Sequence, residues 1–228
     1  MSTKQMRSAL VAVLLLVQGL LCAPLALAET REALFRAAAS DDEAAIVGMV
    51  LKGLNVGTQD ETGQTALLIA AREGSLKVAR FLMKQPMVKV NARNKQDESP
   101  LMMAALKGHL ELARELIAHK ADVNKPGWTP LHYASSNPQP DSRDMVALLL
   151  ENHAYIDAES PNKTTPLMMA AHYGHADAVK LLLEEGADPS LRNEQGLTAV
   201  DFARRAGRAE QADMIAAFVR AKQPTGRW

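Results

Sequence analysis

The sequence predicts an all-α solenoid, a stack of similar helix–turn–helix units, and three observations lead to this fold class. A short signature recurs, in which Thr or Ser precedes Pro or Ala and then Leu or Val. Its copies begin 34, 30, 36 and 33 positions apart. Each copy opens two apolar segments of helical period and a turn, with more apolar surface than one unit can bury alone. The signature begins at Thr65, Ser99, Thr129, Thr165 and Thr198.

The unit of residues 159–192 carries the pattern most completely. Thr165 is placed to cap the free N–H groups of a short helix, and Pro166 occupies the first helical position, where its missing N–H costs nothing. A pair of alanines then gives this helix a face with little bulk, so that a neighbouring helix can approach closely. Gly174 is expected to end the helix in a conformation that other residues reach only at a cost. A second helix, rich in Val and Leu, follows.

Further pieces recur between the signatures, and together these residues resemble the ankyrin repeat. Its pattern is roughly D-x-x-G-x-T-P-L-H-x-A-A-x-x-G-H, then a Val/Leu-rich helix, then G-A-D-V-N. The resemblance extends from Glu32 to Ala221. It implies an ankyrin-repeat solenoid with projecting β-hairpin turns and a non-enzymatic role in binding another protein. The additional matching pieces are Asp60–Gly63, Gly108-His109, Ala121–Asn124, Gly174-His175 and Gly186–Asp188.

The chain is expected to divide into a leader over 1–28, a repeat domain over 29–221 and a flexible tail over 222–228. Asp41-Asp42 stand at the corner of the first unit, and Arg204, Arg205 and Arg208 stand in the last unit. We therefore expect both end units to be caps whose polar outer faces meet water. The expected units are 32–59, 60–93, 94–124, 125–158, 159–192 and 193–221.

Residues 1–28 have the pattern of a cleavable secretory signal. Lys4 and Arg7 give a short positive region, an apolar run follows, and Ala26-Leu27-Ala28 suits an export peptidase that cuts before Glu29. A membrane anchor is the first alternative, but the apolar run is short for a helix that must cross a bilayer. A lipoprotein is the second alternative, because Cys22 lies near the end of the run. The expectation is a periplasmic protein, with secretion as the second choice.

Composition excludes several classes of function. Cys22 is the only cysteine, so cleavage leaves no thiol for a disulfide, a nucleophile or a thiolate metal site. The 26 basic side chains less Lys4 and Arg7 leave 24 against 26 acidic ones, a balance that gives no drive toward nucleic acid. No later segment is apolar enough to cross a membrane. No nucleophile elbow, phosphate-binding glycine loop or H-E-x-x-H helix occurs, so we expect neither an enzyme nor a cofactor.

Histidines are the main candidates for a metal site. His172 and His175 have an H-x-x-H spacing and support the alternative function, that of a periplasmic metal- or cofactor-binding protein. A zinc site needs three or four converging ligands, and no acidic partner is placed with them. The ankyrin resemblance instead implies that His109, His132 and His175 form hydrogen bonds to a turn or to the neighbouring repeat. We therefore expect no metal.

The fourth unit is irregular in two places. Its first turn, 125–128, is about three residues short by comparison with the other units, so its hairpin is expected to be stunted. Its corner, 136–144, is about three residues longer than its equivalents and contains two prolines, which oppose helix. Such insertions often shape a binding site, although neutral drift in an exposed corner is the alternative. In the third unit Asp97 replaces the usual turn glycine, and Asp tolerates the left-handed conformation.

Methionine pairs occupy equivalent places in the third and fifth units, Met102-Met103 and Met168-Met169. Helical geometry turns only one residue of a neighbouring pair toward the stack, so we expect the first of each pair in the core. The second would then face the concave groove, where a flexible thioether suits a binding surface.

The concave face is expected to bind the partner, because hairpin tips and short helices line it. In ankyrin proteins the contacts come from variable positions in the turn and after the Ala-Ala pair. Trp128 and Tyr173 are the expected anchors, since aromatic side chains flanked by charge are typical hot spots. Packing of Trp128 against the next hairpin is the equal alternative. The predicted partner-binding residues are Arg72, Glu73, Lys95, Glu98, Leu106, Lys107, Trp128, Ser136, Asn137, His172, Tyr173 and Arg205.

The predicted function is a monomeric interaction module in the bacterial cell envelope. It would protect, position or inhibit a periplasmic protein of mixed charge, such as an oxidative-stress enzyme or a toxin. A purely structural tether that uses Trp228 in the tail is a third interpretation. The scaffold by itself carries no chemistry that names its ligand.

Overall fold

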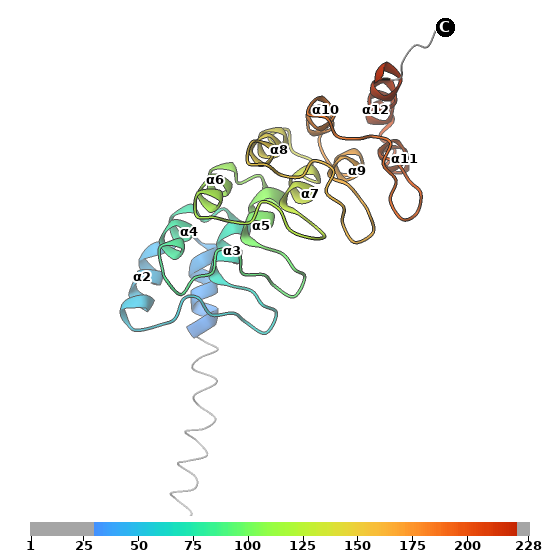
Figure 1. The fold of residues 1–228 in the computed structure, drawn as a ribbon. Helices are drawn as coiled ribbons and strands as arrows, with labels where there is room; N and C mark the ends of the chain where they lie inside the picture. The colour runs from blue at the N-terminus through green and yellow to red at the C-terminus, as the bar shows by residue number, and fades with distance from the viewer. Residues whose placement is uncertain (1–29, 223–228) are drawn as a thin grey trace, which may run out of the picture.

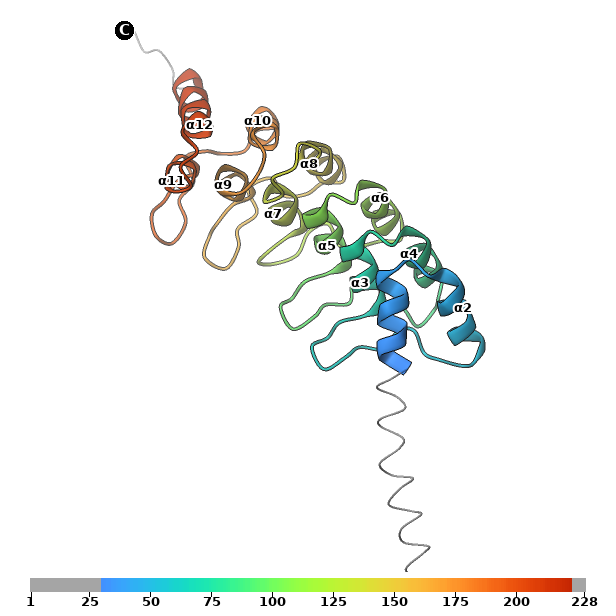
Figure 2. The same cartoon turned by 180° about the vertical axis from the view of Figure 1, so that it is seen from behind.

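A computed structural model describes residues 30–222, which form two layers of helices stacked along a curved axis (Figures 1 and 2). Successive inner helices pack on one another, and so do successive outer helices. This confirms the predicted all-α solenoid. The inner layer begins with a helix over 30–39 and continues with α3 (Ala66–Glu73), α5 (Pro100–Lys107), α7 (Pro130–Ser135), α9 (Pro166–His172) and α11 (Ala199–Arg205). The outer layer contains α2 (Glu43–Leu51), α4 (Leu76–Met83), α6 (Leu110–Ala118), α8 (Ser142–Glu151), α10 (Ala176–Glu184) and α12 (Ala209–Lys222).

The expected leader, and Trp228 in the tail, lie outside the described residues. At the C-terminal end, α12 runs through Lys222, where the tail was expected to begin. Within residues 30–222, no helix has both the length and the apolarity needed to cross a bilayer.

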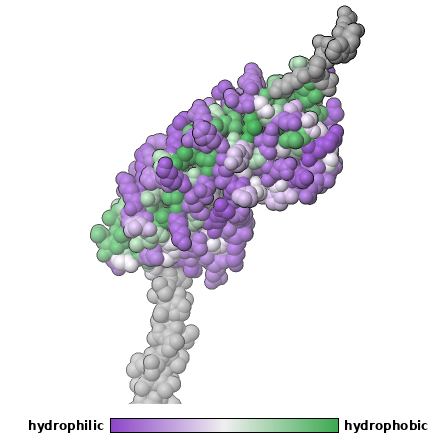
Figure 3. All heavy atoms as spheres, in the orientation of Figure 1, coloured by the Kyte–Doolittle hydropathy of each residue, from purple (hydrophilic) through white to green (hydrophobic). Residues whose placement is uncertain are grey.

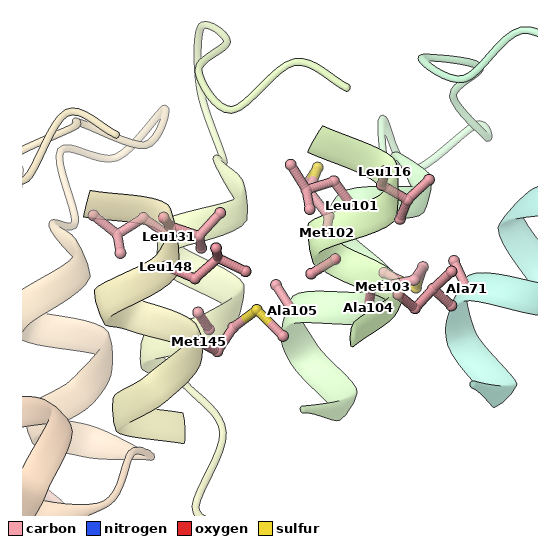
Figure 4. Packing of buried hydrophobic residues seen from close by; sticks show 14 of the residues in the cluster. Ala71, Leu101, Met102, Met103, Ala104, Ala105, Leu116, Leu131, Met145 and Leu148 are labelled. Carbon is pink, nitrogen blue, oxygen red and sulfur yellow. The ribbon is translucent and has the colours of Figure 1, made fainter. Parts of the chain in front are cut away.

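Alanines of the inner helices form the centre of the core. Ala70, Ala104 and Ala170 have no exposed surface, and they let adjacent inner helices approach closely. Met102 is fully buried as predicted, but Met103 is only 5% exposed, so the expectation that it faces the groove is wrong. Figure 4 shows the reason, because Met103 of α5 lies against Ala71 of α3. Because α5 packs against an inner helix on each of two sides, both Met102 and Met103 are buried.

Each inner helix from α3 onward starts at a Thr or Ser in extended backbone conformation. The hydroxyl of Thr65 accepts a hydrogen bond from the N–H of Leu68, which satisfies one free donor of α3. In four later units the side chain of the third helical residue also accepts a hydrogen bond from the backbone N–H of the cap residue. The acceptor is the Met102 sulfur in α5, the His132 ring in α7, the Met168 sulfur in α9 and the Asp201 carboxylate in α11.

His132 joins two repeats through a fully buried ring. Its Nδ1 accepts from the N–H of Thr129 at 3.1 Å, so Nε2 carries the proton and donates to the carbonyl of Thr164 at 2.9 Å. This confirms the expected hydrogen bond from His132 to the neighbouring repeat. Burial lowers the pKa of the imidazole from 6.5 to about 4, despite the opposing effect of its bond to Thr164. A second proton would place an N–H of Nδ1 against that of Thr129.

Glycine at the helix corners is required for two different reasons. Gly74 and Gly108 have φ of +78° and +76°, the left-handed conformation. Gly174 does not have a positive φ, so the conformational reason expected for it is wrong. A Cβ at this position would lie 2.1 Å from the carbonyl oxygen of Ser135 and 2.8 Å from the Cα of Ala170. Gly174 is therefore needed because the neighbouring repeat approaches too closely for any side chain.

The first unit is not the polar cap that Asp41-Asp42 suggested. Asp42 caps α2, and the Asp41 carboxylate accepts from the N–H of Val78 in the next unit, so both acids serve the helix ends. The outer surface of α2 carries Ala44, Val47 and Leu51, the last 83% exposed. In α10 the equivalent positions hold Asp177, Lys180 and Glu184. Figure 3 shows hydrophobic surface at this end of the molecule.

Gly174→Ala is expected to destabilise the fold by about 1–3 kcal/mol, because the added methyl must displace the backbone of Ser135. Gly48→Ala is the matched control. Nothing lies within 4 Å of a Cβ at Gly48, which is inside α2, so this change should stabilise by about 0.5–1 kcal/mol. Urea unfolding followed by circular dichroism measures both values. Equal effects of the two substitutions would contradict the steric explanation.

His132 makes stability depend on pH. Since its folded pKa lies below the unfolded value, its contribution is complete above 6.5 and is lost as the pH falls toward about 4. The free energy of unfolding should fall by about 2 kcal/mol between about pH 7.5 and pH 5 on this account. In His132→Gln the fall should be smaller, with lower stability at the higher pH. An unchanged pH profile in this variant would assign the dependence to other groups.

Candidate functional site

A hollow of about 300 Å³ opens between the last three units, on the side of the inner helices and hairpins. We call it the α9–α11 hollow, after the two helices that form its floor. It brings together four residues that the sequence analysis predicted as partner-binding, Trp128, His172, Tyr173 and Arg205. The other lining residues are Asn162, Thr164, Met169, Asn193, Gln195, Leu197 and Phe202.

One wall of the hollow is a run of aromatic rings. His172 lies between Tyr173 and Phe202, with ring centroids 4.2 Å and 6.0 Å away, and both contacts are edge-to-face. The Nδ1–H of His172 donates to the carbonyl of Phe202 at 3.3 Å, which ties the end of α9 to α11. Tyr173 follows the last residue of α9 and is 51% exposed. The wall is thus held in place by contacts between two repeats while its outermost ring meets solvent.

Trp128 lines the opposite side of the hollow and is also partly buried against the core. Its ring meets that of His132 edge-to-face, with centroids 5.2 Å apart, and it packs against the core while still lining the hollow. The turn before it is held by Lys125, whose ammonium donates to the carbonyls of Pro126 and Trp128 at 3.0 and 2.9 Å. The Lys125 side chain is only 3% exposed and pairs with Asp97.

The hairpin at 125–128 is built differently from its neighbours. Within the described part of the chain it lacks the backbone bond that closes each complete hairpin, so Lys125 takes over that role. Asp97, its ion-pair partner, has a positive φ of 62°, as expected for a residue that replaces glycine. Hydrogen bonding to Lys125 lowers the pKa of this carboxyl. The closing bonds of the complete hairpins are Asp60 N to Gln64 O, Asn94 N to Glu98 O, Ser160 N to Thr164 O and Asn193 N to Leu197 O.

Adjacent hairpins on both sides of this short turn are tied together. The N–H of Lys95 donates to the carbonyl of Thr62 at 2.8 Å, and that of Glu194 donates to the carbonyl of Asn162 at 3.0 Å. Among the described residues, no such bond reaches the 125–128 turn. Within residues 30–222, the 125–128 turn is therefore not tied to the neighbouring hairpins by a backbone hydrogen bond.

The remaining predicted residues of the second and third units lie along the face outside the hollow. Arg72 and Glu73 pair with each other at 2.9 Å. Glu98 accepts from the hydroxyl of Tyr133 at 3.3 Å, and burial beside this carboxylate raises the Tyr133 pKa to about 12. The side chains already engaged in these contacts are less available to a partner. Lys95 and Lys107 are exposed, and Leu106 is half-buried.

The assignment of Asn137 as a partner contact is wrong, because this residue is only 3% exposed. Its side chain lies beside Gly108 of the preceding corner and accepts from the N–H of Gln139 at 2.9 Å. Ser136 is half-buried and donates to the carbonyl of Tyr133. The long corner thus packs on its neighbour and does not extend the concave face. Its last residues, from Ser142, belong to α8 despite the prolines before them.

Two floor residues, Met169 and Phe202, were not among the predicted binding residues. Both stand four residues after the helix cap, the position that Met103 and Ile69 bury in earlier units. Phe202 is larger than Ile69 at the same position, whereas Met169 is the same residue type as Met103 and carries no such signal. Met169 is half-buried and lines the hollow, as expected for the second methionine of its pair.

The side chains of His172 and His175 form hydrogen bonds to different helices. His172 donates to α11, whereas Nδ1 of His175 accepts from the N–H of Asp177 at the start of α10. His109 donates from Nε2 to the carbonyl of Arg72 in the previous unit at 3.2 Å. Across residues 30–222 no three His, Cys, Asp or Glu side chains gather closely enough to hold a metal ion.

Comparison with known proteins identifies the repeat. The family description "Ankyrin repeats (3 copies)" matches residues 7–94 and 86–160, and "Ankyrin repeats (many copies)" matches residues 149–203. The nuclear factor NF-kappa-B p105 subunit of Gallus gallus is 33% identical over 166 residues, 70% of this chain and 17% of its own length. The palmitoyltransferase Hip14 of Drosophila melanogaster is 38% identical over 91 residues, 38% of this chain and 14% of its own length. The chain therefore spans less than a fifth of these relatives.

Among solved structures, the chain resembles one in a complex of a predatory endopeptidase from Bdellovibrio bacteriovorus with an immunity protein. The TM-score is 0.70 and the sequence identity 29%, and the match covers 81% of this chain and 97% of the other. The family matches cover most of the sequence, and the helix pairs, caps and hairpins agree with them. The chain belongs to the ankyrin repeat family.

Proposed function

We propose that this protein is an exported, non-enzymatic binding module that inhibits or protects against another envelope protein by holding it on the concave face. The observation that carries the proposal is the α9–α11 hollow. There, aromatic side chains and one arginine meet on a rigid scaffold beside a shortened turn. Rigid aromatic anchors surrounded by polar groups are typical of protein-binding hot spots. A role in protein binding is also what the ankyrin family as a whole performs.

The comparison with the endopeptidase complex supports an enzyme or toxin as the partner. The match covers 97% of the similar chain, so that chain is little longer than the solenoid shared with this protein. Inhibition requires only that the bound module cover a functional surface of its partner. We therefore favour an exported hydrolytic enzyme over the oxidative-stress enzyme considered from the sequence.

Export is the remaining part of the proposal. Lys4, Arg7, the apolar run and the Ala26-Leu27-Ala28 site support secretion to the periplasm with cleavage before Glu29. We propose that it acts as a monomer, although its first unit lacks the polar outer face expected of a cap. A purely structural tether stays a separate hypothesis, and it makes no use of the hollow.

Photo-crosslinking in the native host tests the proposal. A benzoylphenylalanine replaces Tyr173 in the hollow, and a matched variant carries it at Tyr155, which is 69% exposed and outside the hollow. We expect one protein adduct in the periplasmic fraction with the first variant and none with the second. Addition of the purified chain should then reduce the activity of the captured protein. Folded, exported protein that gives no adduct at Tyr173, or the same adducts at Tyr155, would overturn the proposal.

A further inference from the structure

The α9–α11 hollow contains one permanent charge. Arg205 is exposed at its rim, and no Asp or Glu is among the lining residues. Its guanidinium donates to the amide oxygen of Gln195 at a long 3.5 Å. Elsewhere on the described chain, Arg72, Arg80 and Arg93 are each paired with a carboxylate. Within residues 30–222, Arg205 forms no ion pair, so it offers an unneutralised positive charge to whatever enters.

The floor beside this charge is apolar and aromatic. Met169, Leu197 and Phe202 are half-buried, and the Trp128 ring closes the far side. A volume of about 300 Å³ is at the lower end of what small-molecule sites enclose. It suits one or two amino-acid side chains better than a cofactor. The exposed amides of Asn162 and Gln195 stand at the hairpin side, where they can meet a peptide backbone.

We propose that the hollow is a subsite for a partner segment that carries an aromatic side chain next to an aspartate or glutamate. The aromatic ring lies on the floor between Trp128 and Phe202, and the carboxylate pairs with the guanidinium of Arg205. Charge complementarity is the basis of this choice, because the hollow has a cation and lacks an acid. The inference rests on the proposed function and names the chemistry of its partner.

Blocked peptides test this chemistry, because they carry no terminal charge. The probes are acetyl-GSFDGS-amide, the same peptide with Asn for Asp, and the same peptide with Ala for Phe. Binding to the chain from Glu29 is followed by the nuclear magnetic resonance signals of the Trp128 indole N–H and the Gln195 amide. We expect the Phe-Asp peptide to bind about threefold more tightly than the Phe-Asn peptide, the range of an exposed ion pair. The Ala-Asp peptide should bind more weakly than the Phe-Asp peptide.

Two neighbouring arginines supply the control. Arg205→Gln should abolish the preference for Asp over Asn, whereas Arg204→Gln should retain it, because Arg204 is exposed on the same helix but outside the hollow. Equal binding of the Asp and Asn peptides to the unchanged protein overturns the inference. Loss of the preference in both variants also overturns it, since the attraction would then be diffuse. If no peptide binds while crosslinking at Tyr173 still captures a protein, the subsite chemistry fails and the proposed function stands.

Discussion

Each unit of this chain buries its apolar surface only against the units beside it, so everything depends on how closely inner helices approach. Alanines at the contact, such as Ala104 and Ala170, remove the bulk that would keep the helices apart. The same closeness appears at the corners, where Gly174 has no room for a Cβ. Close packing of this kind leaves little tolerance for added atoms, which is why the fold constrains a few small residues more strongly than many large ones.

Buried polar groups add hydrogen bonds and an ion pair to the packing of the alanines. A buried histidine spans α7 and the next hairpin, and buried Lys125 holds a turn that is too short for the usual backbone bond. Each of these groups is fully engaged, as burial requires, because an unpaired polar group inside the stack would be costly. The fourth unit is irregular in sequence, yet its substitutions replace one stabilising contact by another. Its long corner is likewise packed on the preceding unit, with Asn137 beside Gly108.

The candidate binding site arises from the way the repeat changes along the chain. The position four residues after each cap buries Ile69 and Met103 in early units and opens into the hollow at Met169 and Phe202. The shortened turn of the fourth unit places Trp128 among the residues that line the hollow. The result is a concave face with a distinct feature at its C-terminal end, where aromatic rings and an unpaired arginine lie close together. At the other end, α2 presents Ala44, Val47 and Leu51 where other outer helices present mostly charge.

Much of this could be predicted from the sequence, because helix caps, Ala-Ala pairs and turn glycines act within a single unit and recur at a fixed spacing. The fold class, the cap at Thr165, the core position of Met102 and the left-handed Asp97 follow from such local rules. The grouping of Trp128, Tyr173 and Arg205 around one hollow was decided by the tertiary structure, since it depends on how three units stack. The same is true of buried Asn137, of Met103 and of the reason for Gly174. In each case the deciding contact comes from a neighbouring repeat, about thirty residues away in the chain, which no local pattern describes.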